Sequence, residues 1–243
     1  MCGRFTLTTP AAEWAALFEL DSVPDFEPRY NIAPTQPVAA VRSRFRAQHD
    51  ETLSERVEGS GSTREFANLR WGLVPHWAKE PDLKGRTLIN ARSETVSERP
   101  SFRDSFRFRR CLIVADGFYE WQPAGARKQP YWIRLDSEEP FAFAGLWDTW
   151  TDGSETIESC TILTTDANEA LRPIHDRMPV ILGRASHETW VDPETPSWDL
   201  ERLLVPWPSD AMLLHPVSTH VNHVGNDDPD CIVPQRSQTD LFG

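Results

Sequence analysis

Residues 110–121 read RCLIVADGFYEW, an apolar run followed by Asp-Gly and then by an aromatic run. β-Branched and aromatic residues favour strands, and Asp-Gly between two such runs is a strong short-range signal for a β-hairpin. The stretch therefore predicts two antiparallel strands joined by a turn at Asp116-Gly117. Glu120 interrupts the aromatic run, and strand alternation puts its side chain on the same face as that of Phe118.

The remaining chain predicts many short strands and few short helices. Further strands are expected at 37–44, 66–75, 130–135, 141–147, 159–165 and 212–218, and a loop at 29–36. Helix starts are expected at Thr9-Pro10, at Asp166 with Glu169 three residues on, and at Thr195-Pro196. This pattern is typical of an α+β fold. We expect a single domain with a curved, barrel-like, mostly antiparallel sheet and a few short peripheral helices.

The length of 243 residues and the 39% hydrophobic content predict one domain, over residues 1–233. Residues 45–65 are polar and predict a surface loop insertion, and 234–243 predict a flexible tail. In that tail Gln238, Leu241 and Phe242 faintly resemble a peptide that docks on sliding clamps, the alternative being a plain polar tail. No apolar run reaches the roughly 18 residues of a membrane span, and no secretory signal is evident. We therefore expect a cytoplasmic, nucleoid-associated monomer.

The net charge of −12 argues against a general nucleic-acid binder held by bulk electrostatics. The excess acid lies entirely in residues 131–243, whereas residues 1–130 carry 19 basic and 17 acidic side chains. The chain has 22 arginines and only 3 lysines. Arginine binds phosphate with two hydrogen bonds and stacks on bases. Residues 1–130, which carry most of the arginines, can therefore still bind a nucleic acid. The low lysine content also suits a salt-adapted cytoplasm.

The four cysteines stand at positions 2, 111, 160 and 231, without the C-x-x-C spacing of a zinc or redox site. His220 and His223 lack a suitably spaced third ligand. We therefore expect no metal and no cofactor, and we interpret the last three cysteines as core residues.

Cys2 differs from them because removal of Met1 would leave a free α-amine and a thiol on one residue. Both groups are partly nucleophilic near neutral pH. An aldehyde would condense with the amine to an imine, and the thiol would then close a thiazolidine ring. Gly3 allows close backbone approach, and Arg4 offers a guanidinium for phosphate. The alternative is that cysteine at the second position serves only translation and processing.

Nine blocks of sequence, in order, resemble the SOS response-associated peptidase family. They are MCGRF (1–5), RYNIAPTQ (29–36), RWGLVPHWAK (70–79), INARSET (89–95), ADGFYEW (115–121), AGLWDTW (144–150), TTDAN (164–168), IHDRMPVIL (174–182) and VSTHVN (217–222). Members of that family shield abasic sites by crosslinking to single-stranded DNA. The resemblance covers nearly the whole chain.

The resemblance implies a set of site residues. Cys2 would be the crosslinking nucleophile, Asn90 would position its amine, Glu120 would open the abasic sugar, and His175 would assist imine chemistry and reversal. Arg92 would bind phosphate, and Arg4, Asn31, Arg99 and Arg177 would line the DNA channel. Trp77 matches one member of a stacking tryptophan pair, whereas Ala78 replaces the other.

General acid–base help suits the opening of a closed abasic sugar, and an apolar setting would bring the pKa of Glu120 toward neutrality. A solvent-facing Glu120 and a hydrogen-bonded surface His175 are the structural alternatives. We therefore expect an enzyme that forms a thiazolidine crosslink with abasic sites in single-stranded DNA, with abasic-site lyase activity as a further possibility. A thiol peptidase that processes its own terminus, or a noncatalytic single-strand binding module, remain as other functions.

Overall fold

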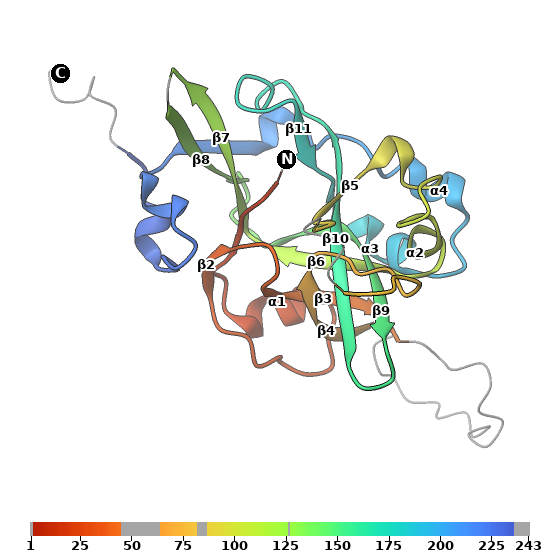
Figure 1. The fold of residues 1–243 in the computed structure, drawn as a ribbon. Coiled ribbons are helices and arrows are strands. Elements are labelled where there is room, and N and C mark those ends of the chain that lie inside the picture. Colours follow the sequence, from red (N-terminus) through yellow and green to blue (C-terminus); the bar gives the residue numbers. More distant parts are fainter. Residues whose placement is uncertain (1, 45–63, 82–86, 126, 236–243) are drawn as a thin grey trace, which may run out of the picture.

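The computed structural model describes residues 2–44, 64–81, 87–125 and 127–235 (Figure 1). The loop expected at 45–65 lies outside these residues except for its last two, which begin a strand, and the tail positions Gln238, Leu241 and Phe242 also lie outside them. No helix within the described ranges is both long and apolar enough to cross a membrane.

Five strands close into a barrel. They are β3 (Pro37–Ser43), β4 (Arg64–Trp71), β6 (Arg110–Ala115), β9 (Phe141–Thr151) and β10 (Thr156–Asp166). The ring runs β10-β4-β3-β6-β9 and returns to β10; only β4 and β10 pair in parallel. The short strands β5 (Asn90–Arg92), β11 (Arg177–Pro179) and β12 (Ile181–Leu182) extend it. The expected barrel-like, mostly antiparallel sheet is confirmed.

A second sheet of five strands lies beside the barrel (Figure 1). Its order is β13 (Met212–Pro216), β8 (Arg127–Leu135), β7 (Gly117–Ala124), β1 (Phe5–Leu7) and β2 (Arg29–Ile32). The loop expected at 29–36 is therefore wrong in its first half, because β2 pairs with β1. Antiparallel β1 continues the sheet beyond β7, so the start of the chain runs along this sheet.

The hairpin expected within residues 110–121 is wrong. Strand β6 pairs with β3 and β9 in the barrel, whereas β7 pairs with β8 and β1 in the other sheet. The chain passes from one sheet to the other at Asp116, whose carboxylate accepts hydrogen bonds from Thr6, Thr8 and Thr9. A Cβ at Gly117 would lie 2.2 Å from the indole nitrogen of Trp132, so close packing of β7 on β8 requires glycine here.

The helices are short and peripheral, as expected: α1 (Ala11–Leu17), α2 (Arg103–Phe108), α3 (His187–Val191) and α4 (Ser197–Glu201). Single 3-10 turns occur at Ser93–Thr95, Arg184–Ser186, Ser209–Ala211, Thr219–Asn222 and Pro229–Cys231. Thr9 does not cap α1, because its side chain donates to Asp116. The helix expected from Asp166 is wrong: Asp166 ends β10, pairs with Arg177, and is followed by turns.

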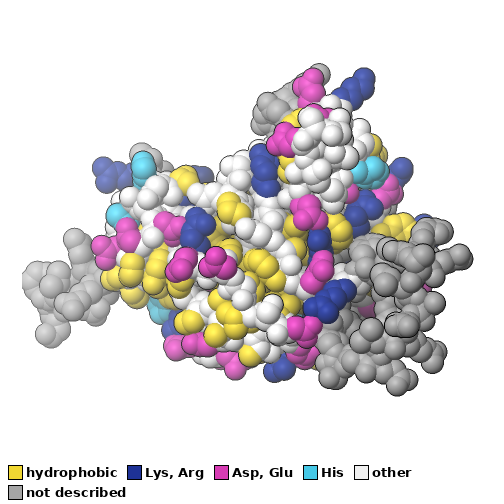
Figure 2. Space-filling view, turned by 90° about the horizontal axis from the view of Figure 1, so that it is seen from below, with side chains coloured by type: hydrophobic (Ala, Val, Ile, Leu, Met, Phe, Trp, Pro, Cys, Tyr) yellow, Lys and Arg dark blue, Asp and Glu magenta, His cyan; other side chains and the backbone are white. Residues whose placement is uncertain are grey.

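Large aromatic side chains, among them Phe5, Trp71 and Phe143, fill the core between the barrel and β1. Arg110 is buried with them and donates to four backbone carbonyls at the ends of α2 and α3. It therefore fixes these helices to the barrel. Seen from below, the exterior mixes apolar side chains with charges of both signs (Figure 2).

Candidate active site at the amino terminus

Cys2 lies between the two sheets, just before β1. Its residue is fully buried, and its backbone carbonyl accepts a hydrogen bond of 2.9 Å from the side-chain amide of Asn90 on β5. On the other side the carbonyl of Arg4 accepts a bond of 3.0 Å from the Tyr119 amide of β7. The first residues are therefore held from both sheets at once.

Glu120 follows Tyr119 on β7 and is only 2% exposed, so the solvent-facing alternative is wrong. Burial raises the pKa of its carboxyl above the ordinary value, and nearby positive charge, that of His175 included, opposes the shift. Burial also raises the pKa of the Cys2 thiol, and the negative charge of Glu120 adds to this effect. The charge of His175 thus acts on the Glu120 carboxyl, and the charge of Glu120 acts on the Cys2 thiol.

His175 lies two residues before the start of β11. Its Nδ1 accepts a hydrogen bond of 2.9 Å from the Arg177 amide and lies 2.8 Å from the Asp176 carboxylate. An unprotonated Nδ1 accepts from the Arg177 amide, whereas a protonated Nδ1 would donate to the Asp176 carboxylate. The four residues expected to perform chemistry thus come from four separate segments, and the fold brings them to one place.

Arg4 is held by the late segment of the chain. Its guanidinium donates to the Asn31 side chain at 2.8 Å and to the carbonyls of Val221 and Asn222 at 3.0 and 3.4 Å. Asn31 itself is fully buried and donates to three backbone carbonyls in residues 221–226. The expectation that Asn31 lines the DNA channel is therefore wrong, because its buried side chain orients Arg4 instead.

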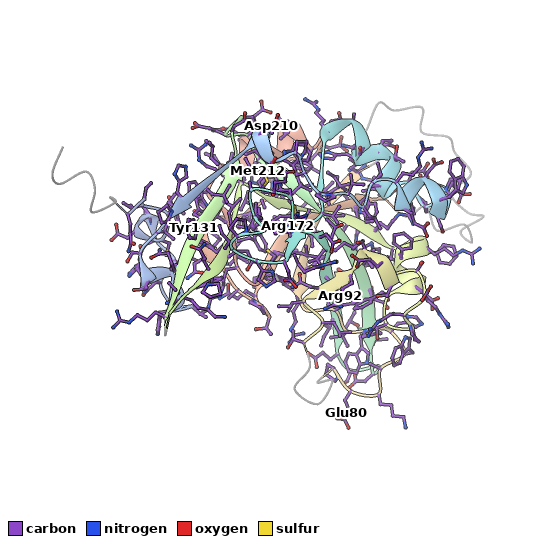
Figure 3. The ribbon with its side chains drawn as sticks, turned by 90° about the horizontal axis from the view of Figure 1, so that it is seen from above. Glu80, Arg92, Tyr131, Arg172, Asp210 and Met212 are labelled. Atoms are coloured by element: carbon purple, nitrogen blue, oxygen red, sulfur yellow. The ribbon has the colours of Figure 1, made fainter. Side chains whose placement is uncertain are left out.

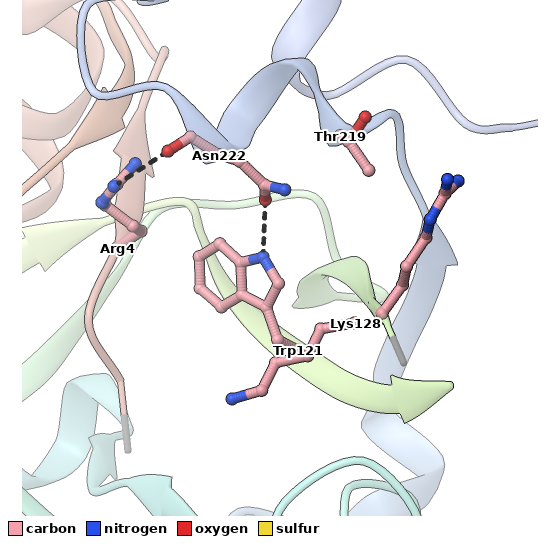
Figure 4. A pocket seen from close by; sticks show the side chains of 6 residues that line it. Arg4, Trp121, Lys128, Thr219 and Asn222 are labelled. Carbon is pink, nitrogen blue, oxygen red and sulfur yellow. Dashed lines mark hydrogen bonds between the residues drawn. The ribbon is translucent and has the colours of Figure 1, made fainter. Parts of the chain in front are cut away.

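An open cavity of about 690 Å³ adjoins Arg4 (Figure 4). Its lining consists of Arg4, Trp121, Arg127, Lys128, Thr219 and Asn222. The Trp121 indole donates a bond of 2.8 Å to the Asn222 side chain, which fixes the ring at the cavity wall. Three cations beside an aromatic ring suit a ligand that is both anionic and able to stack.

The sequence model of the SOS response associated peptidase (SRAP) family matches residues 1–224. The chain belongs to this family. It is 39% identical to "Abasic site processing protein YoaM" of Bacillus subtilis, over 93% of this chain and 95% of that protein. It is 37% identical to "Abasic site processing protein HMCES" of Gallus gallus, over 86% of this chain and 67% of that protein. A crystal structure of a Bacteroides thetaiotaomicron protein has a TM-score of 0.82 at 25% identity, over 97% of this chain and all of that one.

The other arginines that the SRAP resemblance assigned to DNA differ in how far their guanidinium groups are exposed. Arg177 is mostly buried and is engaged by Glu94, Asp166 and the Thr164 carbonyl. Its guanidinium therefore braces β11, which follows His175, and is not available as a channel lining. Arg92 and Arg99 are exposed, and from above Arg92 lies between the sheet that carries β8 and the loop that carries Glu80 (Figure 3).

Several residues that line the cavity beside Arg4 were not predicted from the sequence. Trp121, Arg127, Lys128, Thr219 and Asn222 were not assigned a role, although Trp121 directly follows Glu120 and the basic pair is evident in the sequence. The long separation between β7 and residues 219–222 hides the cavity from local patterns.

One group of ligand-type side chains lies nearby, formed by His220, Asp228 and Cys231. Nδ1 of His220 faces the Asn226 amide and Nε2 faces Asp228, while the Cys231 thiol donates to the Asn226 carbonyl. Hydrogen bonds account for this arrangement, which ties the late segment together.

Proposed function

We propose that the mature chain recognises abasic sites in single-stranded DNA and captures them covalently through Cys2 after removal of Met1. One observation carries the proposal: buried Cys2, which would be amino-terminal once Met1 is removed, lies beside the buried Glu120 carboxyl, and His175 lies close to that carboxyl. The names of the relatives, abasic site processing proteins, support the same substrate. The product would shield the lesion during replication.

The chemistry begins with the sugar, which is mostly a closed hemiacetal. Glu120 would open it by moving a proton between the ring oxygen and the anomeric hydroxyl, as expected of a carboxyl whose pKa lies nearer neutrality. The Cys2 amine would then attack C1′ of the free aldehyde, and loss of one water would give an imine. The thiol would add across the C=N bond, sulfur to carbon and hydrogen to nitrogen, closing the thiazolidine.

The raised pKa of the Cys2 thiol favours this order of steps. A thiol that stays protonated is a weak nucleophile, so the amine attacks first. His175 would exchange a proton with the departing water and in the reverse reaction. The Asn90 side chain would hold Cys2 in place through its hydrogen bond to the Cys2 carbonyl.

The cavity beside Arg4 would take the neighbouring nucleotide. Arg4, Arg127 and Lys128 offer positive charge for phosphates, and Trp121 offers a stacking surface. Covalent capture also reduces the need for tight noncovalent binding by this acidic chain, because a brief encounter in the correct geometry suffices.

The test is a denaturing gel of mature protein incubated with a single-stranded oligonucleotide that carries one abasic site. A heat-stable shifted band is expected, and it should disappear with Cys2→Ala and with a retained methionine. A thiol peptidase would give no band but would cleave a peptide, and a simple binding module would shift only native gels. Strand cleavage at the site would reveal lyase activity. Absence of the band from the wild-type protein would refute the proposal.

A further inference from the structure

His175 lies on a loop that connects β10 to β11, over residues 167–176, which we name the His175 loop. The two strands pair antiparallel, and the Ala167 amide donates to the Asp176 carbonyl at 3.0 Å, so the loop is closed at its base. Asn168, the last residue of the TTDAN block, is the second residue of this loop. The position of His175 therefore depends on what holds the loop between its two ends.

The Asn168 side chain joins the His175 loop to the chain that leads into β13. The residue is buried, and its Oδ1 accepts a hydrogen bond of 3.0 Å from the Leu171 amide. The Leu171 carbonyl in turn accepts from the His175 amide at 2.9 Å. On the other side, Nδ2 of Asn168 donates to the Trp207 carbonyl at 2.8 Å and to the Met212 sulfur at 3.1 Å. Two consecutive hydrogen bonds therefore link the Asn168 side chain to the backbone of His175.

These contacts leave the His175 loop little freedom to move. The Asn168 amide nitrogen has two acceptors, and a displacement of the loop would leave buried polar groups without partners. Leu171 is fully buried in the core and holds the middle of the loop. From above, Arg172 of the loop lies near Met212 of β13 (Figure 3). The loop is therefore fixed before DNA arrives, as the precise placement of a proton-transfer group requires.

Gln122 connects the same loop to the strand that carries Glu120. Strand alternation puts the side chains of Glu120 and Gln122 on the same face of β7. Nε2 of Gln122 donates a hydrogen bond of 3.1 Å to the Pro173 carbonyl, two residues before His175. The charge of His175 also acts on the Glu120 carboxyl, so these two side chains lie close enough to influence each other. The loop is thus held on one side by Asn168 and on the other by Gln122.

We infer that Asn168 and Gln122 are positioning residues: they hold the His175 loop so that the imidazole stays beside the Glu120 carboxyl. The inference rests on the proposed function, in which His175 exchanges a proton with the departing water and in the reverse reaction. Both side chains bind the backbone of the loop, so their effect must pass through His175. Loss of either side chain should slow the proton transfer and leave DNA binding unchanged.

The experiment measures two rates for Asn168→Ala and Gln122→Ala at saturating abasic-site single strand. One is the single-turnover rate of crosslinking, and the other is the release of labelled strand from a preformed crosslink into an excess of unlabelled strand. Asn168→Ala should lower both rates about 10- to 100-fold, the effect of displacing a reacting group by roughly 1 Å. Gln122→Ala, which removes one hydrogen bond, should lower them about 3- to 10-fold. The half-saturating DNA concentration should stay at the wild-type value.

The same two substitutions in a His175→Ala protein separate positioning from a general loss of structure. If both residues act through His175, neither substitution should slow the reaction further in this background. Thr165→Val is the matched control, because the buried Thr165 hydroxyl donates to the Leu204 carbonyl at 3.2 Å and not to the loop. This control should keep both wild-type rates.

Further slowing in the His175→Ala background, a raised half-saturating concentration with unchanged rates, or equal slowing in Thr165→Val would each overturn the inference. Wild-type rates in Asn168→Ala and Gln122→Ala would do the same. If Asn168→Ala fails to fold, Gln122→Ala decides alone, because Gln122 is only half-buried. Failure of the wild-type protein to crosslink would instead refute the proposed function.

Discussion

The side-chain amide of Asn90 donates a hydrogen bond of 2.9 Å to the backbone carbonyl of Cys2. Asn90 is fixed in turn by β5, where it pairs with Ile162 of β10 in parallel register. The barrel thus determines where the amino-terminal residue lies, and the flexible start of a chain becomes part of a defined site. This relationship has a direct consequence for the rate of crosslinking.

Asn90→Asp should slow crosslinking more than Asn90→Ala. The aspartate keeps the shape but sets a carboxylate oxygen against the Cys2 carbonyl, whereas alanine only removes the donor. A lost bond that leaves a buried carbonyl unsatisfied costs about 1–3 kcal/mol, roughly a 5- to 150-fold change if it falls wholly on the reactive geometry. Single-turnover gels measure the rate, and noncovalent affinity for intact single strand should stay constant. Equal rates in all three proteins would contradict the role.

Glu120→Gln should crosslink roughly 10²–10⁴-fold more slowly, the usual contribution of general acid–base catalysis. An amide preserves the shape of the side chain but cannot exchange protons with the sugar. Binding of intact single strand should not change. The comparison is made with abasic-site DNA at saturating concentration, and an unchanged rate would remove Glu120 from the mechanism.

The same variant should be more stable than the wild type at neutral pH. Burial raises the folded-state pKa of Glu120, so the folded protein binds more protons than the unfolded one between the two pKa values. Stability therefore falls as pH rises through this window, and the cost is fully present above the folded pKa. Urea unfolding at several pH values should show the advantage of Glu120→Gln shrinking as pH falls toward the ordinary glutamate pKa. A constant difference would show that the carboxyl does not titrate as expected.

The barrel and the short helices followed from the sequence because strand composition and turn residues are local signals. The sequence did not reveal that residues 110–121 are divided between two sheets. This division depends on hydrogen bonds from the distant Thr6, Thr8 and Thr9 to Asp116. Asp-Gly is equally compatible with a hairpin turn and with a crossing between sheets. Only the partners of the carboxylate distinguish the two.

The reactive residues of the site could be predicted from the sequence, whereas the residues that hold them in position could not. Cys2 and Glu120 stand out by chemistry, whereas Asn31 and Arg177 look like DNA ligands until their burial is known. An arginine that binds phosphate and one that pairs with Glu94 have the same signature in sequence. Long-range contacts, such as Arg4 with Val221 and Asn222, decide between them.

Asp116→Asn should lower both stability and crosslinking. The carboxylate accepts five hydrogen bonds from residues 6–9, four on Oδ2 from Thr8 and Thr9 and one on Oδ1 from the Thr6 hydroxyl. Asparagine would remove the negative charge that strengthens these bonds and would turn its NH2 group toward the Thr6 hydroxyl. We expect a loss of about 2–4 kcal/mol in the free energy of unfolding, in line with a broken buried network. Thr9→Ala, which removes one bond, should cost about 1 kcal/mol. Similar losses in the two variants would argue against a shared network.

Cys2→Ser should separate the two covalent steps. The mature serine protein keeps the α-amine, so it should form the imine with abasic-site DNA, but a hydroxyl is a poor nucleophile for closing the ring. Borohydride should therefore trap a crosslink that is lost on heating without reduction. A heat-stable crosslink formed by this variant without borohydride would contradict closure through sulfur.

Arg127 and Lys128 should contribute to the salt dependence of single-strand binding and not to chemistry. Both line the cavity beside Arg4, at the end of the β7–β8 pair. Removing two phosphate contacts should reduce the slope of log affinity against log salt by about 1.4, since each contact to a single strand contributes about 0.7. Arg103→Ala is the control, because α2 lies across the molecule from β7 and β8 (Figure 1).

Fluorescence anisotropy with an intact single strand, measured over a range of salt, gives the slope. If the Arg127→Ala/Lys128→Ala protein keeps the wild-type slope, the single strand does not bind along this cavity. If its crosslinking rate at saturating DNA is lower, these cations contribute to the chemical step.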